Sequence, residues 1–195
     1  IRQHKNAINA AKENNVKFIA YTSAGKADTN TLPLAIVHKE TEKSIIETKI
    51  PYSFLRNNWY LENEISSFKE AVTTNIWTNS IDDAKVSWAL RKDYAEAIAK
   101  VLTTDGHENT VYELSRKPVS VKELVGEISK VTGKEITVNN IDKTQYSEML
   151  KSNGLPEPVV EFIVSLQTSI TNGSLNVESE DFEKLLGHPV TSIED

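Results

Sequence analysis

The stretch Ile50–Glu62 reads Ile-Pro-Tyr-Ser-Phe-Leu-Arg-Asn-Asn-Trp-Tyr-Leu-Glu and carries the clearest fold signal in the chain. Its first part, Ile50–Leu55, is a short run of large strand-forming residues that ends abruptly in polar ones. A buried strand of a parallel sheet has this pattern where its carboxyl end opens onto a site. Ligands in open α/β sheets bind just outside such strand ends. We therefore predict a pocket formed by Arg56, Asn57 and Asn58, with Trp59 and Tyr60 as flat surfaces beside it.

A second predicted strand ends in the same way. It covers Val16–Thr22, and its polar end consists of Thr22 and Ser23. A helix from Pro33 to about Lys49 separates the two strands, and proline suits the first turn of a helix. A strand, a helix and a strand in this order predict a right-handed parallel crossover. The two polar strand ends are therefore expected at one edge of the sheet.

Composition excludes several classes of protein. The chain has 195 residues, 26% of them charged and 38% hydrophobic, which indicates a folded domain. A formal net charge of -6 without a basic cluster argues against nucleic-acid binding. No apolar run reaches the roughly 20 residues of a membrane helix, and no signal peptide precedes the first helix, so we expect no membrane partner and a cytoplasmic location. Cysteine is absent and the four histidines lack ligand spacing, so we expect no metal site.

The remaining pattern predicts two parts. Residues 1–118 are expected to form an incomplete NAD(P)-binding domain of Rossmann type, with a strand hairpin over residues 76–90. Residues 119–195 are expected to form a smaller, helix-rich substrate lobe. In this second part, Ser120 and Glu123 have the spacing of a capping box at a helix start. The predicted fold class is α/β, the C-terminal part of a doubly wound parallel sheet plus the smaller α/β lobe.

The beginning of the chain carries its own expectation. It starts at Ile1, and helical spacing is already present over residues 6–11 without a preceding N-cap. We interpret the chain as a fragment that begins partway through an α/β domain. The glycine-rich turn that cradles a dinucleotide pyrophosphate is also missing, because no three of the seven glycines have its spacing.

A series of ordered motifs resembles the NmrA-like family of atypical short-chain dehydrogenases/reductases. Within it the pattern is most similar to bacterial NAD(P)H:quinone oxidoreductases of type 2, and also to triphenylmethane reductases. The resemblance covers almost the whole chain. Its motifs are Gln3-His4, Asn6–Lys12, Val16–Ser23, Ala27–Thr29, His38–Lys43, Leu55–Tyr60, Arg91–Tyr94, Val111–Leu114, Lys151–Pro156 and Leu186–Pro189.

The resemblance implies an NADP(H) cofactor, or NAD(H), and a set of residues around it. Thr22 and Ser23 match the strand end beneath the nicotinamide, where related dehydrogenases keep a catalytic serine. His38 falls at the position of their active-site lysine, and Leu34 stands where they have the catalytic tyrosine. The loop that matches the nicotinamide end of the cofactor, with a cofactor-contacting arginine, consists of Asn57, Asn58, Trp59, Tyr60, Leu61, Glu62 and Arg91.

Several of these residues have a plainer interpretation. His38 is equally well explained as a helix-surface residue, and Arg56 better as an ion-pair anchor of the strand end. Arg91 could form a local pair with Asp93 or Glu96. Tyr60 suits core packing, Ser23 suits a turn, and Trp77 with Trp88 would pack the predicted hairpin.

The resemblance implies hydride transfer from NAD(P)H to quinones or similar electrophiles, with His38 and Ser23 as catalytic residues. Loss of the tyrosine at Leu34 keeps an alternative open, a redox sensor that binds NADP(H) without turnover. An open acceptor pocket beside His38 would favour the enzyme, and a plugged pocket the sensor. We expect the fragment alone to bind the cofactor weakly or not at all, and to be inactive without the N-terminal part that would carry the glycine-rich loop. The natural acceptor, the choice between NADPH and NADH, and a homodimer are left open by the sequence.

Overall fold

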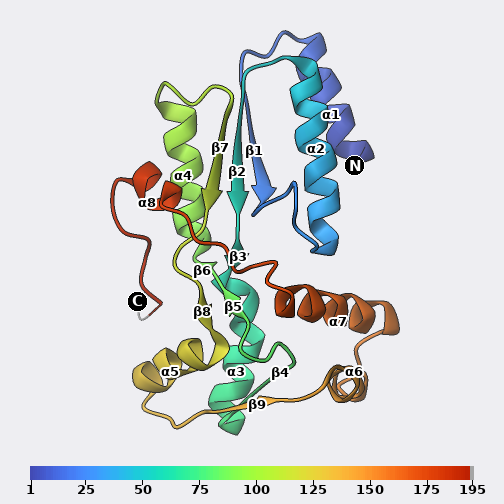
Figure 1. Cartoon of the computed structure of the whole chain (residues 1–195), viewed down its shortest axis with the longest axis vertical. Helices are drawn as coiled ribbons and strands as arrows, with labels where there is room; N and C mark the ends of the chain where they lie inside the picture. The colour runs from blue at the N-terminus through green and yellow to red at the C-terminus, as the bar shows by residue number, and fades with distance from the viewer. Residues whose placement is uncertain (194–195) are drawn as a thin grey trace.

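The computed structural model describes residues 1–193. Its elements fall into two groups, drawn in the upper and lower parts of Figure 1. The first, here called the sheet half, is a three-stranded parallel sheet in the order β1-β2-β7 with two helices on each face. Its elements are β1 (Ile19–Ala24), β2 (Tyr52–Asn57), β7 (Thr110–Leu114), α1 (Arg2–Glu13), α2 (Pro33–Thr48), α4 (Arg91–Thr103) and α8 (Asp181–Leu186).

The second group, here called the helical half, surrounds a short parallel pair of strands, β4 and β9. Two further short pairs, β3-β6 and β5-β8, run between the two halves. The helical half consists of η1 (Leu61–Glu64), α3 (Ile65–Thr74), β4 (Ile76–Asn79), α5 (Val121–Thr132), β9 (Thr137–Asn140), α6 (Lys143–Ser152) and α7 (Glu157–Thr171). The connecting strands are β3 (Trp59–Tyr60), β5 (Lys85–Val86), β6 (Trp88–Ala89) and β8 (Val119–Ser120).

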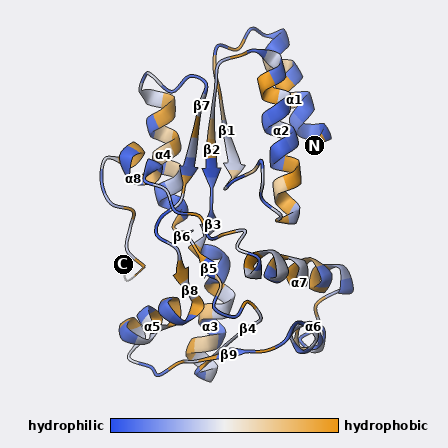
Figure 2. Cartoon of the chain, viewed as in Figure 1, coloured by the Kyte–Doolittle hydropathy of each residue, from blue (hydrophilic) through white to orange (hydrophobic). Residues whose placement is uncertain are grey.

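Alternation along β2 builds the two cores of the sheet half. Phe54 packs with Ile8 and Ile45 against α1 and α2. Leu55, the next residue, points to the opposite face and packs in a cluster that includes Tyr94 and Phe182, from α4 and α8. In Figure 2 hydrophobic and hydrophilic segments alternate along α2 and α4, as expected for helices with one buried face.

A third and larger cluster forms the core of the helical half. It contains Trp77 and Trp88 together with apolar residues of α3, α5 and α7. The clusters interleave along the sequence, because Trp77 lies in the helical half whereas Phe182 returns to the sheet half. The division into domains at residue 118 stays a prediction.

The parallel crossover is confirmed, but both strands begin and end two or three residues later in the sequence than predicted. The first runs Ile19–Ala24 rather than Val16–Thr22, because Val16 donates its N–H to the Ala11 carbonyl and so still closes α1. The second continues through Arg56 and Asn57, which pair in register with β1 and β7. Two acidic partners, the buried Glu42 and the half-buried Glu113, allow Arg56 to remain inside the strand.

The predicted hairpin over residues 76–90 is wrong. β4 pairs in parallel with β9, β5 pairs with β8, and β6 pairs with β3, so these neighbouring segments do not pair with one another within residues 1–193. The polar turn between them is real, and the Asn79 side chain accepts from the N–H of Ile81 at 3.0 Å. The turn directs the chain to new partners instead of folding it back. The capping box of Ser120 and Glu123 is confirmed at the start of α5.

Candidate functional site

β1 and β2 end side by side, and their last residues form one edge of the candidate site. Ala24 lies opposite Asn57 in the parallel register, and the N–H of Gly25 donates to the Asn57 carbonyl at 2.9 Å. Thr22 and Ser23 lie just before this edge. Thr22 is exposed, whereas Ser23 is buried and donates its hydroxyl to a Glu42 carboxylate oxygen at 2.5 Å.

Arg56 fixes the strand end from within the sheet. Its Nε and Nη2 donate to the two carboxylate oxygens of Glu42 at 3.0 and 2.8 Å, and its Nη1 donates to Glu113 at 2.9 Å and to Asp28 at 3.1 Å. Burial lowers the pKa of Arg56, but the hydrogen bonds to Glu42 and Glu113 outweigh it and leave the pKa raised. The guanidinium therefore stays charged, and the interpretation of Arg56 as an ion-pair anchor is confirmed.

Asn57 and Asn58 begin the loop that leaves this edge, and both side chains are buried. The Nδ2 of Asn57 donates to the Tyr60 hydroxyl at 3.1 Å, and the Nδ2 of Asn58 donates to the Ser115 hydroxyl at 3.1 Å. The Oδ1 of Asn58 accepts from the backbone N–H of Trp59 at 2.9 Å. The Oδ1 of Asn57 is different, because it is buried and none of residues 1–193 donates to it. A buried acceptor without a partner is costly, so it marks a place for a donor.

Glu62 and Arg91 join the far end of this loop to α4. Both carboxylate oxygens of Glu62 accept from the backbone N–H of Arg91, at 2.9 and 3.1 Å, in the first turn of α4. The Arg91 guanidinium donates to the side-chain Oδ1 of Asn63 at 3.2 Å and lies 5.2 Å from the centre of the Tyr60 ring. These contacts, and not a pair with Asp93 or Glu96, hold Arg91 in place. Leu61, between Tyr60 and Glu62 in the chain, is buried.

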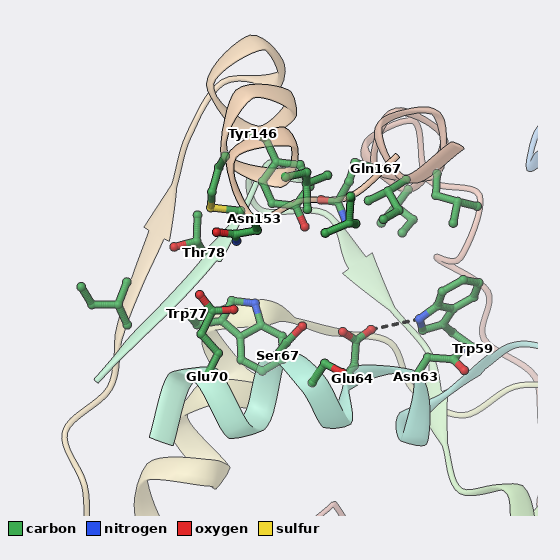
Figure 3. A pocket seen from close by; sticks show the side chains of 18 residues that line it. Trp59, Asn63, Glu64, Ser67, Glu70, Trp77, Thr78, Tyr146, Asn153 and Gln167 are labelled. Carbon is green, nitrogen blue, oxygen red and sulfur yellow. Dashed lines mark hydrogen bonds between the residues drawn. The ribbon is translucent and has the colours of Figure 1, made fainter. Parts of the chain in front are cut away.

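A cavity of ≈ 380 Å³ opens beyond Trp59, between α3 on one side and α6 and α7 on the other (Figure 3). Its wall is mixed. Trp59, Trp77 and Ile170 supply apolar surface, and Glu64, Tyr146 and Gln167 supply polar atoms. Ligand sites of small molecules are mostly apolar clefts of about 300–1,000 Å³ with a few polar groups, and this cavity fits that description.

Glu64 is held at the end of this cavity by two tryptophans. Its Oε1 accepts from the indole Nε1 of Trp59 at 2.9 Å and from that of Trp88 at 3.2 Å. Burial raises the pKa of the Glu64 carboxyl, and the two indole hydrogen bonds only partly oppose this. Trp88 therefore helps to hold a side chain of the cavity wall. It does not pack a hairpin, as the sequence suggested, because β6 pairs with β3.

His38 lies elsewhere, on the face of α2 that meets β1. Its Nδ1 and the Tyr21 hydroxyl are 2.8 Å apart. Burial and the nearby His4 lower the pKa of His38, and Glu42 opposes them. Beside this pair an apolar groove of ≈ 210 Å³ follows the edge of β1 and is lined by His4, Tyr21 and residues of α1 and α2. His38 does not line the cavity beside Trp59.

Comparison with known proteins places the chain in a family. The sequence profile of the NmrA-like family matches residues 1–183. The chain belongs to the NmrA-like family. Quinone oxidoreductase 2 of Escherichia coli is 40% identical over 192 residues, which make up 98% of this chain and 67% of that protein. The resemblance drawn from the sequence motifs is confirmed.

Two solved NmrA-like structures show the same fold. The crystal structure of the NADPH-dependent quinone oxidoreductase of Escherichia coli with NADPH has a TM-score of 0.93 and 40% sequence identity, and the match covers 98% of this chain and 68% of that one. The Citrobacter triphenylmethane reductase with NADP(H) has a TM-score of 0.93 and 34% identity, over 98% of this chain and 68% of that one. The chain thus has the Rossmann-type α/β fold and spans about two thirds of these relatives.

Within this NmrA-like fold the predicted residues form two groups. The first group lies at the carboxyl edge of the sheet and consists of Thr22, Ser23, Asn57 and Asn58. Trp59 follows this group in the chain and lines the cavity. Tyr60, Leu61, Glu62 and Arg91 form the support behind the loop. The role of each residue in binding or catalysis stays a prediction.

Sequence reasoning missed Glu64, Tyr146 and Gln167, which are among the polar residues of the cavity wall. Glu64 follows Trp59 by five positions, but an acidic residue at that distance is no motif. Its second indole partner, Trp88, is 24 positions away and has no local signal. Among residues 1–193, no three histidine, aspartate or glutamate side chains are grouped to hold a metal ion, and no helix there has the length and apolar character to cross a membrane.

Proposed function

We propose that this chain forms the acceptor-binding part of an NADPH-dependent oxidoreductase that reduces quinones or similar electrophiles. The observation that carries the proposal is the open cavity lined by Trp59, which follows the end of β2 by two residues, and by residues of α3, α6 and α7. Ligands of α/β folds bind at the carboxyl edge of the sheet. The 40% identity to quinone oxidoreductase 2 of Escherichia coli supports the same activity.

The residues at the edge of the sheet fit the nicotinamide end of the cofactor. The buried Oδ1 of Asn57 is an acceptor that has no donor among the described residues, and a shift of the loop that exposes it would let it accept from the N–H groups of the nicotinamide carboxamide. Thr22 is exposed one strand away and adds a hydroxyl. Bound NADP(H), or NAD(H), would supply the hydride. Asn58 and the Glu62–Arg91 contact would hold the loop that carries Asn57, and His38 and Ser23 stay candidates for catalytic roles.

The acceptor would occupy the cavity. Aromatic and aliphatic walls from Trp59, Trp77 and Ile170 suit a flat, weakly polar ring, and the polar groups at Glu64 and Gln167 suit its oxygen atoms.

The test is NADPH oxidation by the natural full-length protein that contains this chain, with 1,4-naphthoquinone as acceptor. We expect turnover above the uncatalysed rate and a strong decrease when Trp59→Ala removes one wall of the cavity. Asn57→Ala tests the cofactor edge, where we expect weaker NADPH binding. Absence of turnover with several quinones would overturn the proposal.

A redox sensor is the second candidate. Leu34, at the position of the tyrosine in related dehydrogenases, is 46% exposed and offers no acid. An open cavity supports the enzyme, although it opens beside Trp59 and not beside His38. NADPH binding without turnover would favour the sensor. The proposal also includes a cytoplasmic location and a small-molecule partner. Light scattering after size-exclusion chromatography would decide whether the protein is a homodimer, which the sequence leaves open.

A further inference from the structure

The cavity beside Trp59 contains a carboxyl group that is oriented without any ligand. Both indole hydrogen bonds to Glu64 fall on Oε1, from Trp59 at 2.9 Å and from Trp88 at 3.2 Å. None of residues 1–193 donates to the second oxygen, Oε2, although the side chain lines the cavity. Figure 3 shows Glu64 on the α3 side, with Tyr146 and Gln167 across the cavity. One oxygen is fixed, and the other is available to a ligand.

Burial makes the protonated form of Glu64 more favourable than it is in an exposed glutamate. Burial raises the pKa of the carboxyl above its ordinary value near 4.5, against the indole hydrogen bonds of Trp88 and Trp59. The other titratable groups that line the cavity are Glu70 from α3 and Tyr146 from α6, and among the described residues no lysine, arginine or histidine lines it. No cation there stabilises the carboxylate. A protonated glutamate is a hydrogen-bond donor as well as an acceptor.

We propose that Glu64 is the general acid that protonates the oxygen of the acceptor in this cavity, an inference that rests on the quinone reductase function proposed above. The carboxyl is held by neutral indole donors that leave Oε2 free to carry the proton. The two tryptophans would orient it, and Trp59 would also contact the acceptor ring.

The step balances in protons and electrons. A quinone becomes a hydroquinone when it takes up a hydride, which brings two electrons, and one further proton. The hydride comes from the reduced nicotinamide cofactor, which becomes oxidised. The O–H bond of Glu64 breaks as an O–H bond forms on the acceptor oxygen, and Glu64 is left as a carboxylate. A proton from solvent restores the acid.

The first test compares Glu64→Gln with Glu148→Gln in the full-length protein. Glu148 is an exposed residue of α6 outside the cavity wall and serves as the matched control. General acids contribute about 100- to 10,000-fold, so we expect kcat with 1,4-naphthoquinone to fall by about that factor in Glu64→Gln only. An unchanged kcat in Glu64→Gln would overturn the proposal.

A second acceptor separates proton transfer from a distorted site. A cationic triphenylmethane dye such as malachite green takes a hydride at carbon and needs no proton. We expect Glu64→Gln to retain most of the dye-reducing kcat of the wild type while it loses quinone reduction. An equal loss on both acceptors would indicate a role in shaping the cavity and would overturn the proton-donor role.

A third readout needs no cofactor. Trp59 and Trp88 bond to Glu64, so their fluorescence should change with pH as the carboxyl titrates. We expect a fluorescence transition above pH 4.5 in the wild type that is absent in Glu64→Gln. Fluorescence quenching by 1,4-naphthoquinone measures binding of the acceptor, and we expect its affinity to agree within about threefold in both proteins. The same transition in both would count against Glu64. If the wild type reduces no quinone, the proposed function fails; if it does and Glu64→Gln matches it, only the acid role fails.

Discussion

Arg56 and Glu64 show two ways to place an ionisable side chain away from water. Arg56 has charged partners on nearly every side, because Glu42, Glu113 and Asp28 all accept from its guanidinium. Among the described residues, the donors to Glu64 are the two neutral indoles. The first arrangement keeps its charge at every ordinary pH, whereas the second makes the neutral form more favourable. The ion pairs of Arg56 therefore make the strand end rigid. The neutral surroundings of Glu64 suit the proton-donor role proposed for it.

Loss of the Arg56 side chain should strongly destabilise the fold. Arg56→Met leaves Glu42 buried without a cation, and removal of one partner of a buried ion pair costs about 3–5 kcal/mol. Urea denaturation measures the free energy of unfolding. Lys184→Met, which breaks an exposed pair with Glu180, is the control and should have little effect. A similar small change in both variants would contradict the anchor role.

The stability of Glu64→Gln relative to the wild type should depend on pH. The folded pKa of Glu64 is raised above its ordinary value near 4.5, so the wild type is favoured at low pH and loses that stability as pH rises through the folded pKa. Glutamine keeps a neutral acceptor for both indoles. We therefore expect the Tm of Glu64→Gln, minus that of the wild type, to increase between pH 4 and pH 8. A constant or decreasing difference in thermal unfolding scans would disprove this.

Among the elements, the helices α4 and α5 each have an acidic side chain that accepts hydrogen bonds at the helix start. Glu62 accepts from the first N–H group of α4, and Glu123 accepts from the Ser120 N–H at 2.7 Å at the start of α5. Free N–H groups and the helix dipole make both positions favourable for a carboxylate. The loop that runs from Asn57 to Glu62 is thus held at its far end by the hydrogen bonds between Glu62 and the start of α4.

The cap of α5 provides a measurable case. Ser120→Ala removes the hydroxyl that accepts from the Glu123 N–H at 3.2 Å, and such a loss costs about 0.5–2 kcal/mol. Ser152→Ala, at the exposed end of α6, is the control and should change the free energy of unfolding by less than about 0.5 kcal/mol. Equal effects in urea titrations would show that the capping box contributes nothing.

At the scale of the molecule, the two halves are joined by several passages of the chain. β2 leads directly into β3, and β6 carries Trp88 in one core and Ala89 in the other. α8 then returns from the helical half to the sheet half, where the Phe182 ring stacks on Tyr94 at 4.9 Å. These shared segments predict that the halves unfold together.

Phe182→Ala tests this cooperativity. The side chain is fully buried, and truncation of a buried phenylalanine costs about 3–5 kcal/mol. All three tryptophans belong to or pack against the core of the helical half, so their fluorescence reports on the half that does not contain Phe182. We expect the fluorescence transition and the circular dichroism transition to shift together in urea. A fluorescence transition that stays in place would show independent halves.

The sequence predicts what is local and misses what depends on distant partners. The crossover of β1, α2 and β2 and the capping box follow from neighbouring residues, and both are present. The sequence pattern ends β2 two residues too early, because Glu113, which pairs with Arg56 from β7, is 57 positions away. The strand partner of β4 is β9, some 60 positions downstream, so the local turn suggested a hairpin. Glu64 gave no signal for the same reason.

The buried ion pair between Glu42 and Arg56 also limits which amino-acid substitutions evolution can accept at these two positions. A single replacement at either position leaves a charge enclosed without its counter-charge, whereas a paired exchange to two apolar residues of matching size removes the problem. Relatives that differ here should therefore differ at both positions at once. The same reasoning extends to Glu113, so the three sites are expected to covary across α2, β2 and β7.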